Sequence, residues 1–173
     1  MYYNNMLLRK KGASLVASHG NFTNIRQNLY DAMKAKMDVL CPGNFARNVP
    51  PIGPTTQDKL NFIKHTIFNI CPENTEFEGY FTEKIFQSFE GGCIPVYWAV
   101  GRPEPDIINE DCYCFGDFND MERFKHKVDH VIANHHEYID KKLFTDDAGK
   151  HIDKFYKTLK DQIVALLNKI ESK

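Results

Sequence analysis

The sequence predicts an α/β fold: a parallel β-sheet with helices on both faces, followed by two amphipathic helices. Between residues 13 and 118, short apolar runs rich in β-branched and aromatic residues alternate with helical segments, an order typical of parallel sheets. After residue 119 the apolar residues recur every three or four positions, which indicates helices alone. The chain has 173 residues, of which 42% are hydrophobic, enough to bury the core of one such domain.

Each expected element ends in residues that break regular structure. Glycine, asparagine or proline follows the apolar runs, and the helical segments have apolar residues along one side. The expected strands are residues 13–18, 38–40, 67–71, 93–98 and 112–118. The expected helices are residues 25–36, 58–65 and 82–90, with two longer ones over residues 121–139 and 152–170. Because ligands bind at the carboxyl ends of the strands in such a sheet, the loops there are expected to carry function.

The stretch from residue 67 to residue 98 reads as strand, polar loop, short helix and strand. Thr82 is the expected N-cap of that helix, and the unpaired N–H groups at a helix start favour anions. Lys84 lies in the first turn, where a cation is mildly unfavourable unless it pairs with an anion. Arg26, in the first turn of an earlier helix, is a second candidate for a phosphate. Two plainer interpretations stay open: a capped helix start at Glu83 and Lys84, and a solvated Arg26.

Charge and composition argue against several functions. The net charge of −1 does not fit bulk nucleic-acid binding, which needs a basic surplus. No apolar run is long enough to span a membrane. Five cysteines without a C-x-x-C pair fit reduced thiols in the cytoplasm better than a disulfide framework. The G-x-G-x-x-G, P-loop and G-x-S-x-G motifs are absent, so these nucleotide-binding and hydrolase signatures are not supported.

No metal site is expected. His126 and His130 are four residues apart on a helical segment, but no carboxylate stands at H-E-x-x-H spacing. No Asp-x-Asp triplet occurs, which removes the usual carboxylate clamp for a metal–nucleotide complex. The residues by themselves therefore indicate a nucleotide-like anion at a strand–helix–strand junction.

A more specific pattern lies in the same stretch. Glu73 and Asn74 are followed six residues later by Tyr80, then by the run TEKI at 82–85 and the run IPVYW at 94–98. This arrangement closely resembles the donor-binding motif of the α-1,3/4-fucosyltransferases, glycosyltransferase family 10. The resemblance extends over residues 13–118 and includes Asp117 and Phe118 near its end.

Two positions depart from the family pattern without removing a polar ligand group. Pro72 stands where the family has phenylalanine before the Glu-Asn pair. Ala99 stands where the family has glycine after the tryptophan.

The resemblance implies one half of a GT-B glycosyltransferase, a Rossmann-like domain that binds GDP-fucose. It implies that Arg26 and Lys84 contact the diphosphate, and that Glu83 contacts the ribose or the fucose. Asn74 and Tyr80 would place the donor, while Glu83, Lys84 and Arg26 would take part in catalysis. The family needs no divalent metal for donor binding, and its reaction inverts the anomeric centre. A general base in an N-terminal half deprotonates the glycan acceptor, while cationic groups offset charge on the departing GDP.

These implications define an expected domain organisation and an expected activity. Residues 1–118 would form the nucleotide-sugar-binding domain, and residues 119–173 a helical extension that packs on this domain or on a partner. The chain has room for one GT-B half, so it is expected to bind GDP or GDP-fucose and to be inactive or weakly active alone. Its last helix predicts self-association, and a bacterial surface-glycan pathway with peripheral attachment at the inner membrane fits the unsignalled chain. Two alternatives stay open: a non-catalytic nucleotide-sugar-binding module, and a GT-B transferase that uses another nucleotide sugar.

Overall fold

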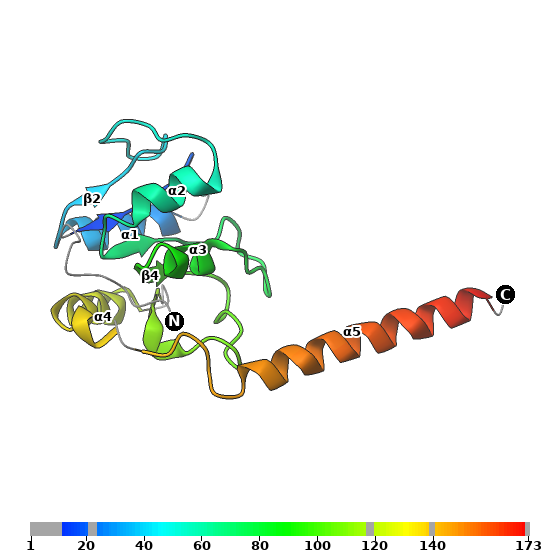
Figure 1. Ribbon diagram of the computed structural model, residues 1–173. Helices are drawn as coiled ribbons and strands as arrows, with labels where there is room; N and C mark the ends of the chain where they lie inside the picture. The colour runs from blue at the N-terminus through cyan, green and yellow to red at the C-terminus, as the bar shows by residue number, and fades with distance from the viewer. Residues whose placement is uncertain (1–11, 21–23, 117–119, 139–140, 172–173) are drawn as a thin grey trace. The chain divides into compact units, whose positions relative to one another are not determined.

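The computed structural model of the protein describes residues 12–20, 24–116, 120–138 and 141–171 (Figure 1). The chain divides into two compact units, Met1–Pro103 with Asp111–Lys141, and Glu104–Glu110 with Lys142–Lys173. Helix α4 (Met121–Ala133) joins its apolar side to the core of the first unit, so this part of the expected helical extension packs on the sheet domain. Asp117 and Phe118, which the resemblance includes, lie outside the described residues.

The first unit is built on a parallel sheet, as the sequence predicts. The described strands are β1 (Ala13–Ser14), β2 (Val39–Leu40), β3 (Phe68–Ile70), β4 (Ile94–Tyr97) and β5 (Cys114–Phe115). All pair in parallel, in the order β2-β1-β3-β4-β5. Since β1 lies between β2 and β3, the chain reverses its direction across the sheet there, and this creates a switch point at the carboxyl ends of β1 and β3.

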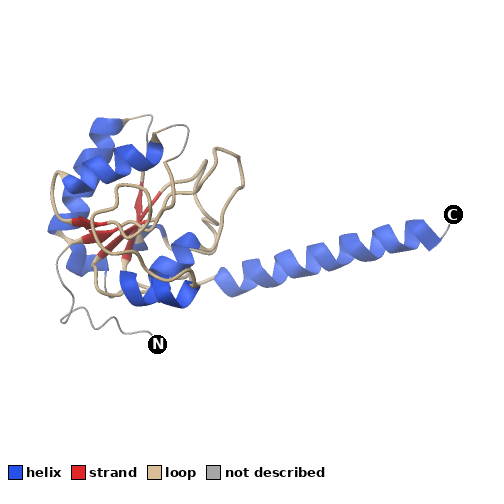
Figure 2. Ribbon diagram, turned by 90° about the horizontal axis from the view of Figure 1, so that it is seen from above, coloured by secondary structure: helices blue, strands red, loops and turns tan. Residues whose placement is uncertain are grey.

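Helices cover both faces of this sheet. Helices α1 (Ile25–Lys34) and α4 bury their apolar residues against one face, in a cluster that also contains Ala13, Phe68 and Val96. Helices α2 (Thr56–Ile63) and α3 (Lys84–Glu90) pack against one another and belong to the opposite face. Figure 2 shows the strands lying between helices. The arrangement confirms the predicted fold class.

The second face is polar at its centre. Side chains alternate along a strand, so Ser14 and Asn69 point away from the apolar cluster. The hydroxyl of Ser14 donates to Asn69 Oδ1 at 3.1 Å, and Asn69 Nδ2 donates to Ser88 Oγ of α3 at 2.7 Å. Ser88 Oγ in turn donates to the carbonyl of Lys84 at 2.9 Å. This buried chain of hydrogen bonds fixes α3, and with it Lys84, relative to β1 and β3.

Several element ends differ from the sequence expectation. Helix α1 stops at Lys34, two residues early. Helix α2 starts earlier than expected, because Thr55 and Asp58 form a capping box: Asp58 N donates to Thr55 Oγ1, and Thr55 N donates to Asp58 Oδ2, each at 3.1 Å. The helix expected over residues 121–139 ends at Ala133 and is followed by a 3₁₀ turn, His135–Tyr138.

The five strands are shorter than the apolar runs that predict them. The regular pairing of strands ends where the chain turns toward the helices, although individual backbone hydrogen bonds continue past the strand ends. One example is the bond from Leu15 N to the Leu40 carbonyl, at 3.0 Å. The apolar runs extend further than the strands because the flanking residues are buried as well.

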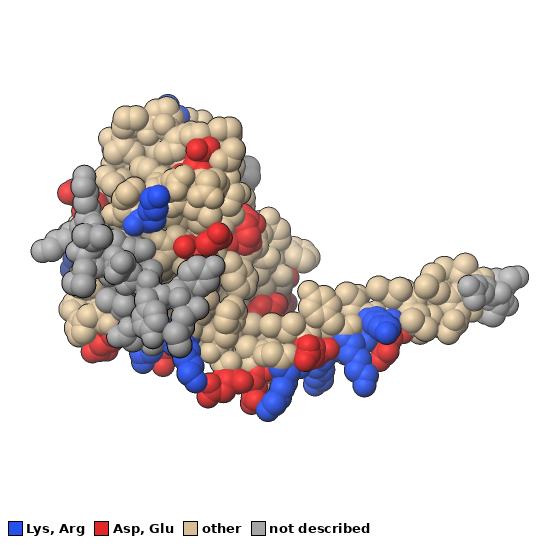
Figure 3. Space-filling model, viewed as in Figure 1, with Lys and Arg blue, Asp and Glu red and all other residues tan. Residues whose placement is uncertain are grey.

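The second unit consists of α5 (Ala148–Glu171) and the segments that precede it. An isolated antiparallel bridge joins Ile108 to Phe144, and Thr145 Oγ1 donates to the Asp106 carbonyl at 2.6 Å. Helix α5 is amphipathic, and Figure 3 shows its charged residues gathered along one side. Within the described ranges, no helix is both long and apolar enough to cross a membrane.

Candidate functional site

A cavity of about 180 Å³ lies at the switch point of the sheet. The residues that follow β1 and β3 form its walls, and α1, α2 and α3 each contribute one cationic side chain. Its lining consists of Leu15, Val16, Ala17, Ser18, His19, Arg26, Lys59, Asn69, Ile70, Cys71, Pro72, Asn74 and Lys84. Arg26 and Lys84, which the sequence singles out from separate helices, therefore share one cavity.

Arg26 is held in place by two loops. It lies in the first turn of α1 and is 4% exposed, so the solvated interpretation is wrong. Its Nη1 donates to the carbonyl of His19 in the loop after β1, and its Nη2 donates to Oδ1 of Asn74 in the loop after β3, at 3.0 Å. Burial lowers the pKa of Arg26, which nevertheless stays a cation in the neutral range. Asn74 thus acts directly on Arg26 and fixes the direction of its guanidinium.

The carboxylate of Glu73 is the central anion of the site. Glu73 is fully buried, at 0% exposure, directly after β3. Its Oε2 accepts from Lys84 Nζ at 2.8 Å, and its Oε1 accepts from the Thr82 N–H and the Tyr97 hydroxyl, both at 2.8 Å. The Thr82 hydroxyl donates to the same carboxylate, at 2.9 Å from Oε1. Sequence reasoning quotes Glu73 as part of a motif but misses this anchoring role.

These bonds decide the charge of Glu73. Burial by itself raises the pKa of its carboxyl group, but the hydrogen bonds from Lys84, Thr82 and Tyr97 outweigh burial and hold the pKa below its usual range. Burial, followed by the bond to Glu73, raises the pKa of the Tyr97 hydroxyl. The carboxylate is therefore ionised at neutral pH, and the phenol keeps its proton.

The start of α3 differs from the sequence expectation. Thr82 is not the N-cap, because its hydroxyl and its N–H both bind Glu73 instead of the helix. Glu83 takes the N-cap position, and its side chain makes no capping bond. Lys84 meets its anion within the protein, since it donates to Glu73 and also to Thr82 Oγ1 at 2.9 Å. An ammonium group has three protons, so one remains for the cavity that Lys84 lines.

A second cavity, of about 420 Å³, also lies beside the residues that follow β1. The proline-rich loop before α2 forms one wall, and α2 and α3 form another. Its lining consists of Val16, Ala17, Ser18, Pro42, Gly43, Asn44, Arg47, Pro51, Ile52, Gly53, Pro54, Thr55, Thr56, Lys59, Glu83 and Gln87. Glu83 therefore faces this cavity and not the smaller one, while Tyr80, 37% exposed, lines neither of the two.

Lys59 lines both cavities. Sequence spacing places it on the wet side of α2, but its ammonium is half-buried and donates to Gln87 Oε1 of α3 at 2.6 Å. Burial is the main cause that lowers the pKa of Lys59. Helical periodicity could not reveal this, because the loop before α2 folds over what would otherwise be a solvated side.

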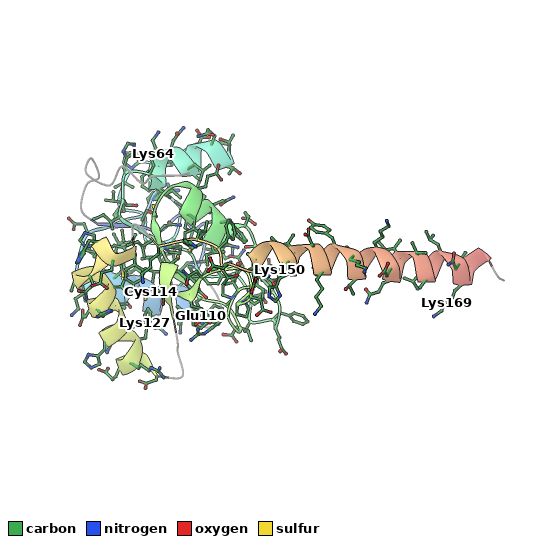
Figure 4. All side chains as sticks on the ribbon, turned by 60° about the horizontal axis from the view of Figure 1, so that its bottom comes forward. Lys64, Glu110, Cys114, Lys127, Lys150 and Lys169 are labelled. Carbon is green, nitrogen blue, oxygen red and sulfur yellow. The ribbon has the colours of Figure 1, made fainter. Side chains whose placement is uncertain are left out.

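The cysteines and histidines form no further site among the described residues. All five cysteines are free and buried, and burial raises the pKa of Cys71 and Cys114 to about 12. Cys114 in β5 and Lys127 in α4 are labelled in Figure 4. Within the described ranges, no group of three or more His, Cys, Asp or Glu side chains could hold a metal ion.

The parallel sheet, with cations gathered at its switch point, defines a class: an α/β domain with a cationic cavity whose charge suits an anion. The sequence model described as glycosyltransferase family 10 (fucosyltransferase), C-terminal, matches residues 6–145. The chain belongs to this family, as its motifs predict.

Relatives and solved structures agree with this membership. The chain is 31% identical to the alpha-(1,3)-fucosyltransferase FucT of Helicobacter pylori over 128 residues, which are 74% of this chain and 25% of that protein. Crystal structures of an alpha1,3-fucosyltransferase with GDP-fucose and with GDP share 27% identity and a TM-score of 0.64 with it. These alignments cover 87% of this chain and 47% of each solved chain. The chain thus spans about a quarter of the curated relative and under half of the solved chains.

Proposed function

We propose that this chain is the donor-binding half of an inverting fucosyltransferase, which transfers fucose from GDP-fucose to a glycan hydroxyl once an acceptor-binding half completes it. The observation that carries the proposal is the cavity at the switch point, where Arg26 and Lys84 converge in a chain of glycosyltransferase family 10. A diphosphate carries the complementary charge. The solved relative was crystallised with GDP-fucose and with GDP, which supports the choice of donor.

Each site residue takes a definite role in this proposal. Arg26 and the free proton of Lys84 bind the diphosphate and offset the charge that grows on GDP as the glycosidic bond breaks. Asn74 orients Arg26, and Glu83 binds a ribose or fucose hydroxyl from the second cavity. Tyr80 would place the donor from the loop before α3. The acceptor and the general base belong to an N-terminal half.

Donor binding without a divalent metal is part of the same proposal. The side chains of Arg26 and Lys84 supply, from two helices, the positive charge that a metal ion would otherwise bring to a diphosphate. Titration of GDP into the chain with excess EDTA and then with excess Mg²⁺ tests this. Equal affinities are expected, and a requirement for Mg²⁺ would contradict the proposal.

Calorimetric titration with nucleotides tests the donor assignment. We expect GDP and GDP-fucose to bind, and GDP-mannose and UDP-sugars to bind more weakly. Arg26→Gln should weaken GDP binding by about tenfold or more, since it removes a charge-assisted bond. The matched control is Lys64→Gln, because Lys64 is exposed at the end of α2 (Figure 4), and its ammonium bonds only to Asn61 among the described residues. Equal binding of UDP-sugars would favour a transferase of another specificity.

One observation favours a second candidate, a nucleotide-sugar-binding module without catalysis. Lys84 is already paired with the buried Glu73, so it has a structural role that needs no substrate. Single-turnover transfer separates the two candidates when the chain is joined to the N-terminal half of a family relative. Fucose transfer by this chimera, with little by the chain alone, supports the transferase. Tight binding of GDP-fucose without transfer supports the module.

A cytoplasmic location, with peripheral attachment to the inner membrane, completes the proposal. The five buried free thiols support a reducing compartment. The apolar residues along α5 support attachment or self-association. Vesicle co-sedimentation of the whole chain tests attachment, and recovery of all the protein in the supernatant would argue against it.

A further inference from the structure

Lys59 is partly buried between two cavities, although helical spacing places it on the solvent side of α2. It lines the small cavity with Arg26 and Lys84, and it also lines the large cavity with Glu83 and Gln87. The residues that follow β1 are likewise common to both linings, so Lys59 stands where the two spaces adjoin. A ligand that occupies both spaces would lie beside Lys59.

The ammonium of Lys59 also lacks a close counter-charge. Its hydrogen-bond partner, Gln87 Oε1 at 2.6 Å, is neutral. Among the described residues, no carboxylate lies within ion-pair distance of it, whereas Lys84 has Glu73 at 2.8 Å. A half-buried cation without a paired anion is costly, and burial accordingly lowers the pKa of this amine. Glu73, Glu83 and Cys71 oppose the shift, and Lys84 adds to it.

Two protons of the ammonium group remain after the bond to Gln87. We propose that Lys59 is a third cationic ligand of the diphosphate in the bound nucleotide, positioned by Gln87 where the two cavities adjoin. The inference rests on the proposed function, because it concerns how the same donor is held. Arg26 and Lys84 bind the diphosphate from the small cavity, and Lys59 binds it at the side where the rest of the nucleotide enters the large one.

A purely structural role is the competing explanation. Lys59 and Gln87 join α2 to α3, and these helices also pack through Leu60 and Ile63 near Gly91. Such a bridge between helices requires a hydrogen bond but no charge, so a glutamine at position 59 would preserve it. A diphosphate ligand requires the charge. The two explanations therefore predict different results for the same substitution.

The test compares GDP, GMP and guanosine as ligands for the wild-type chain, Lys59→Gln, Lys59→Arg and the control Lys64→Gln. Calorimetry should show that Lys59→Gln weakens the binding of GDP by about 10- to 100-fold and the binding of GMP by less. The affinity for guanosine should change by no more than about twofold. Lys59→Arg should recover most of the GDP affinity, and Lys64→Gln should behave as wild type. Thermal unfolding of each variant identifies any loss that comes from an unfolded fraction.

The outcomes separate this inference from the proposed function. If wild type binds GDP and Lys59→Gln binds it equally well, Lys59 is no ligand and only this inference fails. If Lys59→Gln weakens guanosine as much as GDP, the loss does not depend on the phosphates and comes from a general change in the site, which also overturns the inference. If wild type binds neither GDP nor GDP-fucose, the proposed function fails, and the role of Lys59 fails with it.

Discussion

Glu73 is the residue on which the geometry of the site depends most. Its carboxylate joins the end of β3 to Thr82 and Lys84 at the start of α3 and to Tyr97 of β4. Replacement by Gln would leave Lys84 without its counter-charge. It would also place an amide N–H₂ group, which is a donor, against other hydrogen-bond donors.

We expect Glu73→Gln to lower the free energy of unfolding by about 2 kcal/mol or more. Urea denaturation followed by circular dichroism measures the change. Glu78→Gln is the matched control, because Glu78 is exposed in the loop before α3, and its substitution should cost less than about 0.5 kcal/mol. A Glu73→Gln protein as stable as the control would show that the buried carboxylate is dispensable.

The same residue predicts how stability depends on pH. The pKa of Glu73 is lower in the folded protein than the value of about 4.3 expected in the unfolded chain. Its stabilising contribution is therefore complete above the unfolded pKa and is lost as the pH falls through the folded pKa. Urea midpoints measured from neutral pH down to about pH 3 should fall more steeply for wild type than for Glu73→Gln. Parallel curves for the two proteins would contradict the assignment.

At the scale of single residues, sequence reasoning found the charges but not all of their partners. Arg26, Asn74 and Lys84 were found because they stand in motif positions next to strand ends, and these three line one cavity. The pattern does not reveal the anchoring role of Glu73, and the prediction of Thr82 as a cap is wrong, because the carboxylate nine residues away accepts the bonds of Thr82. Such a contact depends on the path of the loop, which helix and strand periodicities do not contain.

At the scale of elements, α2 links stability to the candidate site. This helix of eight residues carries Lys59, and its start depends on the capping box of Thr55 and Asp58. A short helix with one strong cap is sensitive to the loss of that cap.

Thr55→Ala should therefore lower the free energy of unfolding by about 1 kcal/mol and also weaken GDP binding through Lys59. Thr56→Ala is the control, since Thr56 lies one position further on and is not part of the capping box. Urea denaturation and calorimetry measure the two effects. Loss of stability with unchanged GDP affinity would mean that Lys59 keeps its place without the cap.

The elements themselves were largely predictable. Alternation of β-prone and helical segments, punctuated by Gly, Asn and Pro, predicts the parallel sheet and helices on both faces. The ends were less predictable, because ladder pairing stops before burial does. The sequence leaves open what the helices after residue 119 pack against, and Phe124, Val128 and Val131 of α4 are buried with the residues of α1. Amphipathic periodicity shows that a helix buries one side, but it does not identify the element against which that side packs.

At the scale of the whole molecule, α5 carries most of the exposed large hydrophobic residues of the described chain. The exposed apolar residues on this helix are Ile152, Phe155, Tyr156, Leu159, Ile163, Val164, Leu166, Leu167 and Ile170. Monomeric proteins rarely expose a continuous apolar patch of such length, so we expect it to bury itself against a second copy at high concentration.

Light scattering over a range of concentrations should show a mass above 20.1 kDa, the mass of one chain, that falls toward it on dilution. The double substitution Leu159→Asp, Ile163→Asp should hold the protein at the mass of one chain. Lys154→Asp is the control and should leave association intact, because Lys154 is exposed and helical spacing places it opposite the apolar stripe of α5. A constant single-chain mass for wild type would rule out self-association through this helix.

The rates at which the five buried thiols react with a reagent report how often the fold opens locally. Only a thiolate attacks a maleimide or an aromatic disulfide efficiently, and with pKa values of about 11 to 12 at Cys41, Cys71, Cys112 and Cys114, almost none exists in the closed fold at neutral pH. Modification therefore has to wait for a fluctuation that admits the reagent. Because Cys71 is also a wall of the cavity at the switch point, a bound nucleotide would slow its modification more than that of Cys114 in β5.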